Sequence, residues 1–142
     1  MALPKPQCWI VDVDGTLALL GKRNPFSWRG VGQDKPNSPV IEIVRALAQS
    51  PASPAIVLVS GRMEKARTLT QKWLERHQVP YERLYMRENQ NFEPDEDLKR
   101  RIFQRVIFPH FEVVGVLDDR DKVVAMWRSL GLTCLQVAPG DF

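Results

Sequence analysis

Short apolar runs alternate with amphipathic stretches along most of this chain. The apolar runs predict strands over 8–13, 55–59, 83–86, 113–117 and 133–137. Between them, apolar residues recur at the spacing of a helix face, which predicts helices over about 38–50, 66–77, 95–106 and 120–130. Ser38 and Pro39 are expected to begin the first helix as its N-cap and first residue. Residues 18–37 and 87–94 are predicted to be loops.

This alternation predicts an α/β fold with helices on both faces of one sheet. Strands joined through helices run parallel and connect by right-handed crossovers. We therefore expect a five-stranded, mainly parallel sheet in a three-layer α/β/α, Rossmann-like arrangement. The chain has 142 residues, and a chain of this length buries roughly 70% of its unfolded surface. It is accordingly predicted to form a single domain over 1–142.

Polar clusters follow three of the predicted strands. In open parallel sheets, ligands bind beyond the carboxyl ends of the strands. Side chains alternate along a strand, so two aspartates separated by one valine can point to the same side. The following glycine permits a turn that most residues resist. The clusters at the three strand ends are Asp12 with Asp14, Ser60 with Gly61 and Arg62, and Asp118 with Asp119.

Four acids at one sheet edge predict a divalent cation. Neighbouring carboxylates repel unless a cation or a shared proton intervenes, and oxygen ligands favour Mg²⁺. Lys99, Arg62 and Arg23 would supply positive charge for an anionic substrate. The matching chemistry is phosphoryl transfer: one aspartate attacks phosphorus, and a second carboxyl group protonates the leaving alkoxide and then activates water.

Each cluster taken alone also has a structural explanation. The two aspartates before glycine are compatible with a structural turn, and Ser60 or the pair Asp118 and Asp119 with a helix cap. Lys99 alone is compatible with a solvated helix face. Their occurrence in one chain, in the order DxDGT, SGR, Lys, DD, favours a catalytic site.

That order resembles the haloacid-dehalogenase-like (HAD) phosphatases from end to end. More narrowly, the chain resembles the 3′-phosphatase domain of phage polynucleotide kinase–phosphatases. The narrower resemblance is carried by Ile107-Phe108-Pro109-His110-Phe111 and by residues from Asp118-Asp119-Arg120 through Met126-Trp127-Arg128 and Gln136-Val137-Ala138 to Gly140-Asp141-Phe142. The chain has no GxxxxGK[ST] motif, so 5′-kinase activity is not expected from this polypeptide; it is either a stand-alone product or an excised domain.

The resemblance implies a role for each site residue. Asp12 would be the nucleophile and a metal ligand. Asp14 would be the general acid and base and would offer its backbone carbonyl to the metal. The other implied roles are Lys99 as the neutralising cation, Asp95 as its support, Asp118 and Asp119 as metal ligands, and Thr16, Arg23, Ser60, Gly61 and Arg62 as substrate-binding residues. Whether Asp118 or Asp119 binds Mg²⁺ directly stays open.

The expected substrate is the 3′-phosphate end of a nucleic acid. Only about 20 residues follow the DxDGT run before the next helix, and 78–95 is equally short, so no cap domain is expected. An open site suits the end of a large substrate. Residues 22–29 interleave cations with aromatic rings, which can meet phosphates and stack on bases, although a loop whose Phe26 or Trp28 tucks into the core is the competing interpretation.

Two other functions remain in competition with a polynucleotide 3′-phosphatase. One is a small-molecule HAD phosphatase such as a nucleotidase, and the other is a non-catalytic module on the same scaffold. The presence of both Asp12 and Asp14 argues against the second. DNA or RNA preference and activity on cyclic phosphates are not decided by these residues.

Composition places few further limits. The net charge of +3 is weakly informative, and no apolar run reaches the roughly 20 residues of a membrane helix. Cys8 and Cys134 are isolated, which favours a reducing cytoplasm. The resemblance implies that this is the cytoplasm of a bacterium or a phage-infected cell. Members of the resembled family often form homo-oligomers. A chain without a kinase domain would be expected to work beside a separate kinase or ligase.

Overall fold

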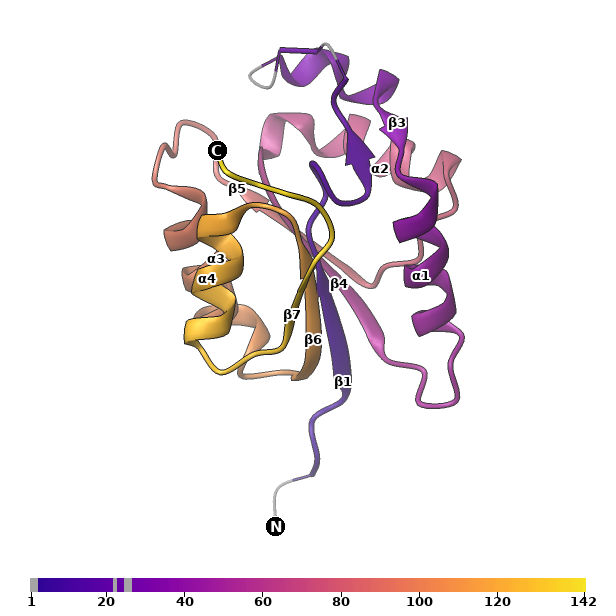
Figure 1. Ribbon diagram of the computed structural model, residues 1–142, viewed down its shortest axis with the longest axis vertical. Helices are drawn as coiled ribbons and strands as arrows, with labels where there is room; N and C mark the ends of the chain where they lie inside the picture. Colours follow the sequence, from indigo (N-terminus) through magenta and orange to yellow (C-terminus); the bar gives the residue numbers. More distant parts are fainter. Residues whose placement is uncertain (1–2, 22, 25–26) are drawn as a thin grey trace.

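The fold is built around one sheet of five parallel strands. The computed structural model describes residues 3–21, 23–24 and 27–142. The strand order is β5-β4-β1-β6-β7, with β1 in the centre (Figure 1). These strands are β1 (Gln7–Val11), β4 (Ala55–Met63), β5 (Arg83–Arg87), β6 (Glu112–Asp118) and β7 (Cys134–Gln136). All pairings within the sheet are parallel, as the alternation of strands and helices predicts.

Helices cover both faces of the sheet. Helices α1 (Ser38–Ala48) and α2 (Arg67–Arg76) lie on one side of it, and α3 (Asp95–Ile102) and α4 (Asp121–Ser129) lie on the other (Figure 1). The apolar stripe of α1, formed by Val40, Ile41 and Val44, is buried against the sheet. The predicted three-layer α/β/α arrangement is confirmed. None of the helices in the described part of the chain is long and apolar enough to cross a membrane.

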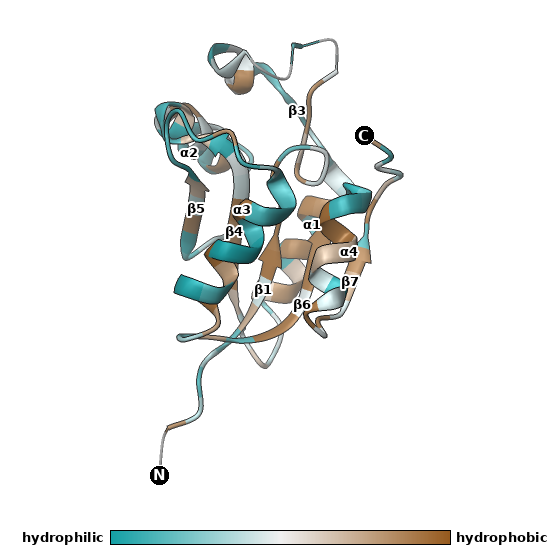
Figure 2. Cartoon of the chain, turned by 90° about the vertical axis from the view of Figure 1, so that its left-hand side faces the viewer, coloured by the Kyte–Doolittle hydropathy of each residue, from teal (hydrophilic) through white to brown (hydrophobic). Residues whose placement is uncertain are grey.

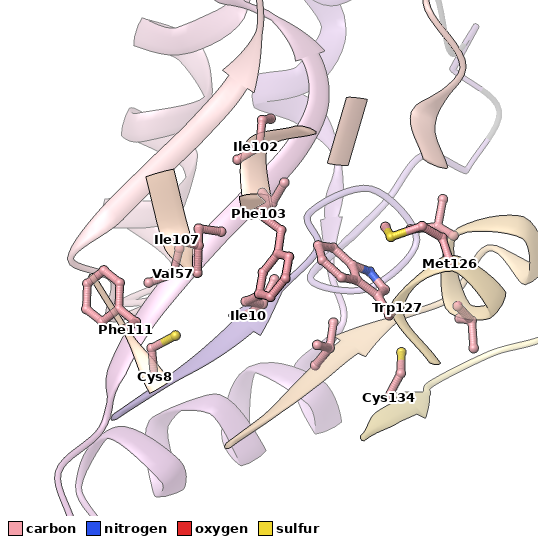
Figure 3. Packing of buried hydrophobic residues seen from close by; sticks show 14 of the residues in the cluster. Cys8, Ile10, Val57, Ile102, Phe103, Ile107, Phe111, Met126, Trp127 and Cys134 are labelled. Atoms are coloured by element: carbon pink, nitrogen blue, oxygen red, sulfur yellow. The ribbon is translucent and has the colours of Figure 1, made fainter. Parts of the chain in front are cut away.

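The core on the α3–α4 side is organised around a buried tryptophan. Trp127 has no exposed surface, and its ring meets that of Phe103 edge to face, with ring centres 6.1 Å apart. Figure 3 shows Met126 and Cys134 on either side of it, with Ile10 of β1 nearby. Figure 2 shows the resulting contrast between apolar inner strands and the polar outer surface of α3. Burial of apolar area of this kind is the main force that holds the layers together.

The segment between β1 and α1 is more ordered than predicted. Instead of a plain loop over 18–37, it contains the short antiparallel pair β2 (Ala18–Leu19) and β3 (Lys35–Pro36) and a 3-10 helix over Trp28–Gln33. Asn37 is the N-cap of α1 in place of Ser38. Its amide N–H donates to Leu17 O at 2.8 Å and its side chain to Thr16 O at 2.9 Å. These contacts are long-range, so local turn composition did not reveal them.

Two other boundaries differ from the sequence prediction. Strand β4 does not end at Val59 but continues to Met63, which pairs with Arg87 after an irregular step in the register. The helix predicted over 95–106 is α3 followed by a π-helical turn over Phe103–Ile107. Strand β1 ends at Val11, so the aspartate that follows lies just beyond the sheet.

The segment after β7 packs against the carboxyl end of β6. The amide of Val137 donates to Asp118 O at 3.0 Å, and the amide of Asp121 donates to Gly140 O at 2.9 Å. Gly140 lies so close that a Cβ atom there would be 1.9 Å from the backbone oxygen of Asp119. Only glycine therefore fits at this position.

Replacing Gly140 is expected to strain this contact. We expect Gly140→Ala to lower the free energy of unfolding by about 1–3 kcal/mol, because the added methyl group overlaps backbone atoms, which cannot rotate away as a side chain can. Chemical denaturation monitored by circular dichroism measures the change. Gly32→Ala is the matched control, since a Cβ there meets nothing within 4 Å. Equal stability of the two variants would contradict the close packing of Gly140.

Candidate active site

The turn after β1 brings two acidic pairs together. The amide of Asp12 donates to Leu117 O on β6 at 2.9 Å, which extends the sheet by one residue. The chain then turns at Gly15, which has a φ of +82°, and the amide of Gly15 donates to Ala18 O at 2.8 Å. A Cβ on Gly15 would lie 2.1 Å from Oδ2 of Asp119. The glycine of the DxDGT run is therefore required by the approach of the second acidic pair.

Three carboxylates and one ammonium group form a buried cluster. Carboxylate oxygens of Asp12, Asp118 and Asp119 lie within 4.8 Å of one another, and all three residues are buried. Nζ of Lys99 donates to Oδ1 of Asp12 at 2.7 Å and to Oδ2 of Asp118 at 3.0 Å. The Lys99 side chain is 3% exposed. Strands β1 and β6 and helix α3 thus join the four residues in one place.

The electrostatics of the cluster are dominated by burial. Burial and the charge of Asp118 raise the pKa of the Asp12 carboxyl well above its ordinary value, while Lys99 acts to lower it. Desolvation acts to lower the pKa of the Lys99 ammonium, but the carboxylates of Asp118 and Asp12 outweigh it and raise that pKa. One cation therefore does not fully compensate the three buried carboxylates.

Other donors fix the orientation of these carboxylates. Asp118 accepts hydrogen bonds from the indole Nε1 of Trp127 at 3.1 Å and from the amide of Asp119 at 2.8 Å. The hydroxyl of Thr16 donates to Oδ2 of Asp12 at 3.0 Å. Trp127 is fully buried in the core, and its single indole N–H also contacts the site. A polar contact of this kind has no sequence signature.

Asp14 occupies a different environment from Asp12. Its side chain is 34% exposed, and it receives three hydrogen bonds from Arg62, from Nε at 3.1 and 3.0 Å and from Nη2 at 2.6 Å. Nη2 of Arg23 lies 3.8 Å from Oδ1 of Asp14. Two guanidinium groups therefore flank this carboxylate at the open edge of the sheet.

A further aspartate, not predicted from the sequence, holds both arginines. The side chain of Asp34 is 1% exposed. It accepts hydrogen bonds from Nε and Nη2 of Arg23 at 2.7 and 3.0 Å and from Nη2 of Arg62 at 3.0 Å. Its backbone oxygen accepts from Nε1 of Trp73 at 2.8 Å. Asp34 lies within the segment predicted to be a loop, and its role is visible only in its contacts with residues distant in the chain.

The other predicted site residues lie close by, and they are already hydrogen-bonded within the protein. Arg62 also donates from Nη1 to Thr70 at 2.9 Å, and its amide donates to Oγ of Ser60 at 3.1 Å. Ser60 and Thr16 have no exposed surface. Direct substrate binding by Thr16, Arg23, Ser60, Gly61 and Arg62 stays a prediction. For Arg62 it requires an exchange of partners when an anion enters.

The carboxylate of Asp95, predicted to support Lys99, contacts two arginines instead. Among the contacts of the described residues, its carboxylate binds Arg87 and Arg120, the latter at 2.9 Å, and not Lys99. It influences Lys99 through charge, since it adds to the raised pKa of that ammonium group. Arg87 also donates from Nε to Gly61 O at 2.8 Å. Asp95, at the start of α3, therefore joins the end of β5 to the start of α4, and Arg87 extends the link to β4.

The arrangement separates two chemical tasks. A buried carboxylate beside a lysine and two further acids is suited to binding a metal and attacking phosphorus. Asp14, unlike Asp12, lies where solvent reaches it, which is the position that a group exchanging protons with a leaving group and with water requires. In the described part of the chain, the longest connections on this edge are the β2–β3 segment and residues 88–94, and neither contains an inserted cap. Lys22, Pro25 and Phe26 of the predicted cation–aromatic loop lie outside the described residues.

Comparison with known proteins agrees with this geometry. The family described as the polynucleotide kinase PNKP phosphatase domain matches residues 6–142. A putative bifunctional polynucleotide kinase/RNA ligase of Autographa californica nuclear polyhedrosis virus is 33% identical over 127 residues, which is 88% of this chain and 18% of that protein.

Solved structures give the same result. Chains from two structures of the Pnkp1/Rnl/Hen1 complex, one described as an RNA repair complex, superpose with TM-scores of 0.93 at 37% identity. They cover 97% of this chain, which in turn spans 44% and 48% of theirs. The chain thus corresponds to less than half the length of these relatives. It belongs to the family of polynucleotide kinase PNKP phosphatase domains, and it is a HAD-type phosphatase.

Proposed function

We propose that this protein removes the 3′-phosphate from the ends of nucleic acid strands through an aspartyl-phosphate intermediate. The observation that carries the proposal is the pairing of buried Asp12, held by Lys99, with half-exposed Asp14, held by Arg62 and Arg23. Phosphoryl transfer by a carboxylate requires both a nucleophile and a separate proton donor. The absence of an inserted cap among the described elements leaves room for a polymer end.

The residues divide the reaction into two steps. An oxygen of Asp12 bonds to phosphorus while the bond from phosphorus to the 3′-oxygen breaks, and Asp14 gives its proton to that oxygen. Water then attacks phosphorus and loses a proton to Asp14 as the bond to Asp12 breaks. Inorganic phosphate leaves, and both aspartates return to their starting state. Lys99 offsets negative charge on the transferred group in both steps.

We infer that Mg²⁺ is the resident cation. Asp12, Asp118 and Asp119 offer only carboxylate oxygens, which suit a hard divalent ion, and these oxygens lie within 4.8 Å of one another. The backbone carbonyl of Asp14 is the further predicted ligand. When bound, the ion supplies Lewis-acid stabilisation of charge on the phosphoryl oxygens.

The names of the relatives support a nucleic acid substrate. One is a putative polynucleotide kinase/RNA ligase, and another belongs to an RNA repair complex. A 3′-hydroxyl is the end that a ligase can use, so a phosphatase beside a kinase and a ligase prepares ends for joining. We propose that this domain acts beside such activities and that RNA ends are among its substrates.

Metal binding is expected to stabilise the folded protein. A ligand at a hundred times its Kd adds about 2.7 kcal/mol, and each kcal/mol raises the Tm of a domain of this size by about 2–4 °C. Thermal unfolding with and without Mg²⁺ should therefore show a shift of several degrees. Asp119→Asn should lose most of the shift. A wild-type Tm that does not change on addition of Mg²⁺, Mn²⁺ or Ca²⁺ would contradict the metal site.

The proposed substrate class is tested with matched esters. With Mg²⁺, a 3′-phosphorylated oligonucleotide should release phosphate with a kcat/KM at least about tenfold above that of a mononucleotide, because an open site leaves a small ester few contacts. Phosphate release measured on DNA, RNA and mononucleotide substrates gives the comparison. A preference for the mononucleotide would indicate a nucleotidase instead.

The nucleophile is tested by Asp12→Asn. Activity should fall by at least about 10⁴-fold, since an amide does not attack phosphorus, while the Tm should change little because the shape of the side chain is kept. Trapping of a BeF₃⁻ adduct on the wild type, and its loss in the variant, provides an independent readout. Substantial turnover by Asp12→Asn would contradict the mechanism.

A further inference from the structure

A tryptophan with two cations lies beside the active site. The guanidinium carbon of Arg29 is 5.4 Å from the ring centre of Trp28, and Nζ of Lys65 is 5.9 Å from it. Arg29 and Lys65 are exposed, and Trp28 is half-buried against the core cluster on the α1–α2 side. Trp28 begins the 3-10 helix Trp28–Gln33, whereas Lys65 lies in the 3-10 turn Glu64–Ala66 after β4. We name these three residues the Trp28 platform.

The platform is anchored by contacts on both sides. Nη1 of Arg76 on α2 donates to Gly32 O at 3.1 Å, and Trp73 donates to Asp34 O just after the 3-10 helix. The amide of Lys65 donates to Oδ1 of Asn89 at 2.9 Å. These anchors use backbone atoms of Lys65 and of Gly32 and Asp34, which follow Trp28 in the chain. They hold the ring and the cations in place while leaving the side-chain charges of Arg29 and Lys65 at the surface.

The platform adjoins the Asp14 half of the site. Arg23, which is near Asp14, donates from Nη1 to Ser27 O at 2.8 Å, immediately before Trp28. Arg62, which binds Asp14 directly, is three residues before Lys65. Both arginines at Asp14 are thus connected to the platform through a few atoms of backbone.

This side of the site is where the leaving group has to be. Asp14 is the proposed proton donor, and it acts on the oxygen that leaves with the nucleoside. The buried cluster around Asp12 faces the phosphoryl group instead. A strand whose terminal 3′-oxygen meets Asp14 therefore extends away from Asp12 and toward the platform.

We propose that the Trp28 platform binds the nucleotides just upstream of the terminal 3′-phosphate. The Trp28 ring stacks on a base, and Arg29 and Lys65 bind the adjoining phosphodiesters. Two like charges around one ring repel each other, so a polyanion between them is favoured. The inference rests on the proposed function, because it assigns the substrate a polymeric leaving group.

The other rim of the site provides natural controls. Phe92 is 83% exposed in the connection before α3, and Arg100 is exposed on α3 itself. Both belong to the side of the sheet that carries Lys99, opposite to α2. They match Trp28 and Lys65 in chemical type, and Arg100 lies on a helix across the sheet from α2.

The experiment compares substrate length in platform and control variants. Steady-state kinetics with Mg²⁺ use a nucleoside 3′-monophosphate, single strands of two to eight nucleotides with a 3′-phosphate, and p-nitrophenyl phosphate. In the wild type, KM should fall as the strand grows. Trp28→Ala and Lys65→Ala should each raise KM for the longest strand about fivefold or more and remove most of the length dependence. Their kcat/KM on p-nitrophenyl phosphate should stay within about twofold of the wild type.

The controls and outcomes separate the two proposals. Phe92→Ala and Arg100→Ala should keep the wild-type length dependence. Lys65→Ala and Arg29→Ala alter exposed side chains, so they test the platform even if Trp28→Ala unfolds. If the wild type releases phosphate from strands and the platform variants keep its length dependence, the platform does not bind substrate. If the wild type hydrolyses only small esters, the proposed function itself is wrong.

Discussion

The site depends on one buried ammonium group. Lys99 places a positive charge between Asp12 and Asp118, where water has been almost entirely excluded. Without it, the pKa of Asp12, which burial already raises, would be higher still, and a protonated carboxyl group is a poor nucleophile. The layered fold makes the contact, because α3 packs against β4 and α4, and Lys99 reaches from there to both acids.

In the outer half of the site, one buried carboxylate pairs with two cations. Asp34 gives one carboxylate to two guanidinium groups, so that Arg23 and Arg62 are held side by side without leaving an unpaired buried charge. Both arginines are thereby held beside Asp14. The chemistry of HAD-type phosphatases thus rests here on two separate networks: Lys99 organises one around Asp12, and Asp34 organises the other around Asp14.

Much of this could be predicted from the sequence, for identifiable reasons. Strand and helix order follows from apolar periodicity, and the alternation of side chains places Asp12 and Asp14 together at a strand end. The contributions of Asp34, Trp127 and Arg87 could not be predicted in this way. Each acts through a contact with residues distant in the chain, such as the indole N–H of Trp127 on Asp118. Local patterns also misplaced the end of β4, because its last pair depends on β5.

Asp12 and Asp14 differ in exposure, so dissolved ions affect the two carboxylates differently. Dissolved ions screen charges that contact solvent, over about 10 Å at 0.1 M salt, but have little effect on groups that solvent cannot reach. The Asp14 side chain is 34% exposed, whereas Asp12 is 7% exposed. Added salt therefore screens the charge of Asp14 more than that of Asp12, whereas the side chains of Arg23 and Arg62, 11% and 5% exposed, are nearly as sheltered as Asp12. Salt-rich surroundings would thus act mainly on the one charge at this edge that solvent reaches.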